Sequence, residues 1–164
     1  MPLPVQLKAV VDQMEFGTDD WRSYINRKTG ELTSFPPEAL SAAEEEEASD
    51  TASDWEQEMI QDCRRVLGDR DFVQLPTKYD IHEYDIMKRF CRSREDDAER
   101  DLLLDAIAGR GAFRMFKSTI HRKGIEQEWY RYRDAALRRI AAEFLEAQGI
   151  AYVDVTAGSG AEGA

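Results

Sequence analysis

The chain has 164 residues, of which 42% are apolar and 34% charged, and its formal net charge is −11. This length allows one domain with a substantial hydrophobic core, and the acidity disfavours general attraction to nucleic acid or to anionic membranes. No apolar run approaches the length of a membrane span, and residues 1–16 do not resemble a signal peptide. We therefore expect a cytoplasmic protein whose Cys63 and Cys91 are buried and reduced, with a disulfide as a minor alternative.

The first part of the chain is predicted to hold one helix and one β-hairpin. Pro4 suits the opening turn of this helix, and its apolar residues share one face: Leu7, Val10, Val11 and Met14. Residues 22–26 and 31–35 follow as two strands, joined by a turn at 27–30 in which Gly30 takes a positive φ. The prolines at 36 and 37 end the second strand, because neither can donate a ladder hydrogen bond.

An acidic segment comes next. Residues 38–62 contain ten acids and no Lys or Arg, and like-charge repulsion predicts a mobile, solvated loop at about 38–53. We favour a simple spacer, and the alternative is an intramolecular cover for the basic residues of the second half.

The second half is predicted to be mostly helical. A helix at 54–67 ends at Gly68, and a short strand at 72–75 is stopped by Pro76. Asp80 is then expected to cap a helix that starts at Ile81, with Glu83 reaching back and Tyr79 packing on Tyr84. Further helices are expected at 98–108, 111–123 and 126–148, and a last strand at 150–155.

These elements indicate an α+β fold, with an N-terminal helix, a β-hairpin and short strands followed by a mostly helical second half. We expect residues 1–155 to form a single domain and residues 156–164 to be a disordered tail of small residues.

Aromatic and basic residues are interleaved most densely at 107–132. Phe113, Phe116 and Ile120 recur at helical spacing and form an apolar stripe. Beside it lies a second stripe, which we call the basic ridge: Arg110, Arg114, Lys117 and His121. Residues 110–139 carry nine Lys or Arg against three acids. The ridge is either a solvated face beside core aromatics or a surface that meets an anionic partner, and we favour the first.

Two residues of the last helix complete the candidate binding set. Trp129 belongs to its apolar face, and Arg133 lies within that face rather than opposite it. Arg133 is either structural, snorkelling or pairing with a carboxylate, or it points into a ligand cleft; we favour the structural role. The candidate binding residues are Arg110, Arg114, Lys117, His121, Trp129 and Arg133.

Catalytic and metal chemistry find little support in the sequence. Residues 109–111 lack the further glycine, the Lys-Ser/Thr ending and the preceding strand of a phosphate-binding loop. The two histidines and two cysteines are too few and too scattered for a zinc site. Pairs such as Cys91 with His82 are a weak case for nucleophilic catalysis. We therefore predict no catalytic residue, no metal and no cofactor.

Several short motifs carry a family resemblance. They are Thr29-Gly30-Glu31, Leu75-Pro76, residues 111–116, Glu128-Trp129-Tyr130 and Gly149-Ile150. In this order, from about residue 5 to 155, the chain resembles a bacterial family catalogued as uncharacterised protein family 158. The resemblance implies a cytoplasmic bacterial protein and no particular activity. Met115 stands where we expect a second Arg, which weakens the basic ridge, and Phe144 stands where we expect Trp.

Three functional classes follow. The first, which we favour, is a non-catalytic interaction or regulatory protein that holds a protein partner through the aromatic and basic surface. The second is a nucleic-acid-binding protein that contacts phosphates through the same ridge. The third is a small enzyme with a cleft near Arg133.

Overall fold

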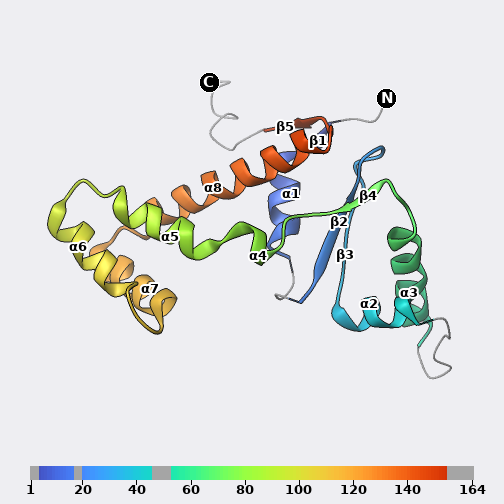
Figure 1. The fold of residues 1–164 in the computed structure, drawn as a ribbon, viewed down its shortest axis with the longest axis horizontal. Helices are drawn as coiled ribbons and strands as arrows, with labels where there is room; N and C mark the ends of the chain where they lie inside the picture. The colour runs from blue at the N-terminus through green and yellow to red at the C-terminus, as the bar shows by residue number, and fades with distance from the viewer. Residues whose placement is uncertain (1–3, 17–19, 46–52, 155–164) are drawn as a thin grey trace. The chain divides into compact units, whose positions relative to one another are not determined.

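The structure is a computed structural model that describes residues 4–16, 20–45 and 53–154 (Figure 1). Its contacts divide the chain into two compact units. Unit 1 comprises residues 1–77 and 140–164, and unit 2 comprises residues 78–139. The predicted α+β fold with a helical second half is confirmed. The division rests on contacts and does not show whether either unit folds without the other, so the single domain at 1–155 stays a prediction.

Unit 1 contains two small sheets. In the first, β2 (Arg22–Asn26) lies between β3 (Leu32–Phe35) and β4 (Phe72–Gln74), and both pairings are antiparallel. In the second, β1 (Val5–Gln6) pairs in parallel with β5 (Tyr152–Val153). The hairpin and the strand before Pro76 are therefore confirmed. Because β1 comes directly before α1 (Leu7–Met14), Pro4 does not lie in the first helical turn, and that prediction is wrong.

The hairpin turn is held by one side chain and one glycine. The Oδ1 of Asn26 accepts hydrogen bonds from the backbone N–H groups of Lys28 and Thr29, at 2.8 and 2.9 Å. Gly30 has φ +78°, as predicted, and its N–H donates to the Asn26 carbonyl at 2.8 Å. Only glycine takes this conformation without a steric cost, so the turn fixes which residues of β2 and β3 face each other.

Two helices pack against this sheet. The core between α2 (Pro37–Glu44), α3 (Asp54–Leu67) and the strands is apolar, and it consists of Tyr24, Phe35, Ala39, Cys63, Val66 and Phe72. The Arg64 guanidinium donates to the carbonyls of Ala42, Ala43 and Glu45, so it satisfies the C-terminal end of α2.

Helix α2 corrects the predicted loop at about 38–53, because residues 37–44 are helical. Pro37 lies in its first turn, where no amide donor is needed, and Ala39 is buried against the sheet. The remainder of the predicted loop at 46–52 and the predicted tail at 156–164 lie outside the described residues.

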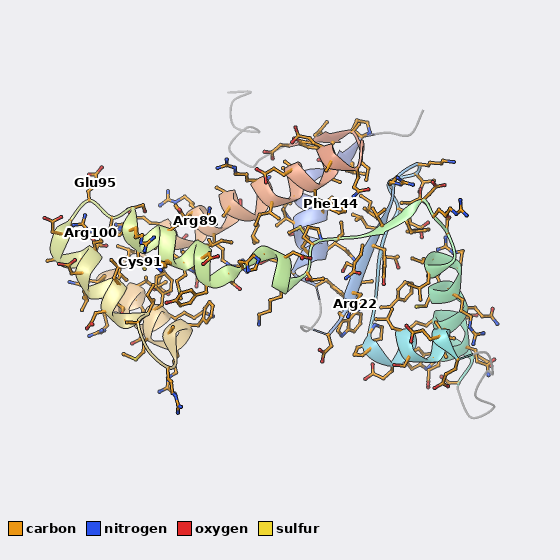
Figure 2. The ribbon with its side chains drawn as sticks, viewed as in Figure 1. Arg22, Arg89, Cys91, Glu95, Arg100 and Phe144 are labelled. Carbon is orange, nitrogen blue, oxygen red and sulfur yellow. The ribbon has the colours of Figure 1, made fainter. Side chains whose placement is uncertain are left out.

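Unit 2 is helical. Its elements are α4 (Lys78–Ile81), α5 (Glu83–Arg92), α6 (Asp97–Ala106), α7 (Ala112–Lys123) and the larger part of α8 (Glu126–Ala147), which continues into unit 1. Glu95, labelled in Figure 2, lies in the connection from α5 to α6, and Arg100 lies in α6 itself. Asp96 caps α6, because its carboxylate accepts from the N–H of Glu99 at 3.1 Å.

The predicted helix start at Ile81 is wrong. Lys78–Ile81 is already helical, and His82, with φ 54° and ψ 62°, separates this turn from α5. Asp80 is therefore not an N-cap. The break also changes the buried face of α5: Ile86 is buried, whereas Tyr84 is 39% exposed and donates its hydroxyl to the Ile107 carbonyl. The side chain of Tyr79 lies outside the described residues.

An aromatic cluster forms the core of unit 2. Phe90 of α5 contacts three rings edge-on, with centroid distances of 6.0 Å to Phe116 and 5.3 Å to both Trp129 and Tyr132. Phe116 and Trp129 also contact each other at 4.8 Å. Edge-to-face pairs contribute beyond the area they bury, so this cluster helps to hold α5, α7 and α8 together.

Both cysteines are buried, as predicted; Cys91 lies on α5 (Figure 2) and Cys63 on α3. Burial raises the pKa of each thiol from 9.0 to about 11, and nearby Asp62 and Glu44 add to the shift at Cys63.

We expect the two thiols of the native protein to react with a thiol reagent far more slowly than those of the denatured protein. The denatured protein should consume two equivalents of the reagent, one for each cysteine. Because unfolded thiols ionise first, folding stability should decline between about pH 9 and pH 11. Full labelling of the native protein within the mixing time would contradict this description.

Candidate binding groove

Helices α7 and α8 are joined by a tight turn that sets one beside the other. Gly124 ends α7 with φ +68°, and its N–H donates to the His121 carbonyl at 3.1 Å. The N–H of Ile125 donates to the Ile120 carbonyl at 3.0 Å. These two bonds form a Schellman motif, which satisfies carbonyls that the helix end leaves without partners. Helix α8 then begins at Glu126.

Unit 2 contains a groove with a volume of about 590 Å³. Helices α7 and α8 contribute most of its lining, and α4 and α5 contribute one residue each. The lining residues are Lys78, Glu83, Phe113, Phe116, Lys117, Trp129, Tyr130 and Arg133. A groove of this volume can hold a small ligand, or one large side chain of a partner together with the adjacent residues of that partner.

Aromatic side chains line the groove at two depths. Phe116 and Trp129 belong to the core and are only 2% and 4% exposed. Phe113 and Tyr130, by contrast, are 42% and 52% exposed. The prediction that Phe113 belongs to the core is therefore wrong: the buried positions of α7 are Phe116, Thr119 and Ile120. The groove thus combines a rigid apolar floor with two aromatic rings that solvent can reach.

Charged side chains in the groove are mainly cationic. Lys78, Lys117 and Arg133 line it together with one carboxylate, Glu83. The Nε of Arg133 donates to the Oε1 of Glu83 at 2.5 Å, and both side chains are partly buried. Arg133 therefore pairs with an acid of a preceding helix and also lines a cleft, which unites the two roles considered from the sequence.

The structure gathers only part of the predicted site. Lys117, Trp129 and Arg133 line the groove. Arg110 and Arg114 are exposed but do not line it.

His121 also lies outside the groove lining. It is exposed, and its Nδ1 lies 2.8 Å from the Oε1 of Glu126. Of the basic ridge, Arg114, Lys117 and His121 lie on α7, Arg110 precedes this helix, and only Lys117 lines the groove.

Sequence reasoning missed Lys78 and Glu83 as groove residues, and it gave no binding role to Phe113 or Tyr130. One signal was available: Phe113 with Lys117, and Trp129 with Arg133, are aromatic and cationic residues at i and i+4 on successive helices. No comparable local signal marks Lys78 or Glu83, because their position depends on how α4 and α5 pack in unit 2.

Among the residues that the structure describes, no group of three or more His, Cys, Asp or Glu side chains is placed to hold a metal ion. In the same part of the chain, every helix is too short or too polar to cross a membrane.

Comparison with protein families gives one informative result. The model of a family described as uncharacterised protein family UPF0158 matches residues 1–157. This range includes all the described residues of both units and every residue that lines the groove. Comparisons with curated proteins and with solved structures gave no match.

Proposed function

We propose that this chain, which belongs to the uncharacterised protein family UPF0158, is a non-catalytic interaction protein that holds a segment of a protein partner in the groove of unit 2. The proposal includes a location in the bacterial cytoplasm, where the partner would also reside. In this proposal, unit 2 alone contacts the partner segment, because every residue that lines the groove belongs to it.

The observation that carries this proposal is the exposure of Phe113 and Tyr130 beside a buried aromatic floor. Single exposed rings are common on protein surfaces, but rings grouped at one groove form the kind of apolar patch that partners cover. Aromatic and Arg side chains also supply most of the binding energy in protein interfaces. Here such rings border a groove that contains Arg133, which is a favourable arrangement for a partner's anchoring side chain.

Nucleic acid is the alternative occupant, and the geometry favours it less. Phe116 and Trp129 are buried edge-on against each other, so their faces cannot stack on bases. Unit 2 has fifteen Lys or Arg against twelve Asp or Glu, and this mixture lacks the strongly basic surface that tracks a phosphate backbone.

Site-specific photocrosslinking in cells tests the proposal. A benzophenone amino acid is placed at Tyr130 or at Phe113, and at Ala135 as a matched control; Ala135 is an exposed residue of α8 that does not line the groove. We expect a discrete protein crosslink from positions 130 and 113 and little from 135. The same crosslink should be lost when Lys117→Glu is added.

Two results would contradict the proposed function. A crosslinked product that nuclease digests would assign the groove to nucleic acid. Equal crosslinking from all three positions, or a product unaffected by Lys117→Glu in a variant of unchanged thermal stability, would show that the groove is not the docking site.

A further inference from the structure

We infer that the partner segment is an acidic peptide with one large apolar side chain, which enters the groove while neighbouring carboxylates pair with Lys117. This inference rests on the proposed function and specifies the chemistry of the partner. It follows from the depth at which the groove residues lie and from the distribution of their charges.

The apolar part of the argument concerns the floor. Phe116 and Trp129 form this floor, with Phe113 and Tyr130 beside them, and the polar groups of these four side chains are the Trp129 indole N–H and the Tyr130 hydroxyl. A charged side chain placed against the floor would lose its water and meet few polar groups, which costs free energy. An aromatic or long aliphatic side chain gains from the same contact. The volume of about 590 Å³ admits one such side chain with adjacent backbone.

The charged part of the argument concerns Lys117. It is exposed, and within the described residues its side chain makes no ion pair or hydrogen bond. It lines the groove together with Phe116 and Trp129, so its ammonium group is available to a ligand that reaches the apolar floor. Arg114 lies nearer the start of α7 and Arg110 just before it, and the part of the chain that the structure describes gives neither of them an ion pair. Carboxylates on the partner complement these cationic side chains.

Glu83 determines where these carboxylates can bind. It is paired with Arg133 at 2.5 Å, so an acid that approaches Arg133 would also meet the negative charge of Glu83. Like charges in close proximity are unfavourable. We therefore place the partner's acids at Lys117, and we assign Glu83 the role of limiting the affinity of acids for Arg133.

Fluorescence anisotropy with defined peptides tests the inference. The probe is a labelled nine-residue peptide with Glu and Asp around one central Phe. Two matched peptides replace the Phe by Gly, or replace every acid by its amide. We expect the acidic peptide with Phe to bind at least about tenfold more tightly than either matched peptide, which corresponds to about 1.4 kcal/mol.

Three variants locate the binding. Lys117→Glu should weaken binding of the acidic peptide by at least about tenfold, and Glu83→Gln should strengthen it by about two- to fivefold. Lys123→Glu is the control, because it makes the same charge change on the same helix at an exposed residue outside the groove. It should change affinity by less than about twofold.

Several outcomes would overturn the inference. If the peptide with Gly binds as tightly as the acidic peptide with Phe, charge attraction alone explains the binding. If the amide peptide binds as tightly, the partner needs no acidic residues. Weakening by Lys123→Glu as large as that by Lys117→Glu would exclude a local contact, and no binding of any peptide at millimolar protein would exclude this partner chemistry. If crosslinking from position 130 still succeeds in that last case, the interaction function stands and only the acidic partner is wrong.

Discussion

Replacing Phe90 by alanine is expected to lower the free energy of unfolding by about 3–5 kcal/mol. Phe90 is almost completely buried and contacts the rings of Phe116, Trp129 and Tyr132. The substitution removes these contacts and leaves a cavity where α5, α7 and α8 meet, which rigid neighbouring rings cannot fill. The guanidinium of Arg94, 5.2 Å from the ring centroid, loses its cation–π partner as well.

Urea denaturation, monitored by circular dichroism, measures this decrease in the free energy of unfolding. Phe113→Ala is the matched control, because it deletes the same side chain from a half-exposed position of the groove. It should cost about 1 kcal/mol or less, and its main effect should be on binding. Equal losses of stability for the two variants would show that Phe90 is not the centre of the unit 2 core.

Replacing Gly30 by alanine is expected to cost about 2–5 kcal/mol, from two separate sources. A side chain at φ +78° is strained by about 1–2 kcal/mol. The new Cβ would also lie 2.7 Å from the Cγ1 of Val5, closer than real contacts allow, so β1 or the turn must move at a cost of about 1–3 kcal/mol.

Two further variants separate these sources. Gly124→Ala has the same strain, at φ +68°, but its Cβ would meet no atom within 4 Å, so it should cost only about 1–2 kcal/mol. Val5→Ala introduced with Gly30→Ala should recover part of the loss, because it removes the atom that the new methyl group meets. If Gly30→Ala and Gly124→Ala prove equally stable, the contact between the turn and β1 does not occur as described.

Elements that depend on local signals were predictable from the sequence. The apolar spacing of α7 and the glycines at 111 and 124 gave its bounds to within one residue. The hairpin likewise follows from Gly30 and the flanking alternation. In each case the residues that determine the element lie within it or next to it.

Elements that depend on distant contacts were not predictable. Helix α2 lies in an acidic stretch that indicates a loop, but Arg64 of α3 caps its end and the sheet covers Ala39. Glu83 fits a capping pattern, yet its carboxylate pairs with Arg133, 50 residues further along the chain. The groove itself arises from this kind of contact, which is why the sequence indicated Lys117, Trp129 and Arg133 but not the lining residues of α4 and α5.

The decisive measurement is an NMR titration that follows the indole N–H signals of the three tryptophans as the acidic peptide with Phe is added. Trp129 lies in the floor of the groove, whereas Trp21 and Trp55 belong to unit 1, where Trp55 is well exposed. Substitution of each tryptophan by Phe assigns the signals. Docking in the groove predicts a saturable shift of the Trp129 signal alone. A shift of the Trp55 or Trp21 signal while Trp129 stays unchanged would contradict it, because the peptide would then bind outside the groove.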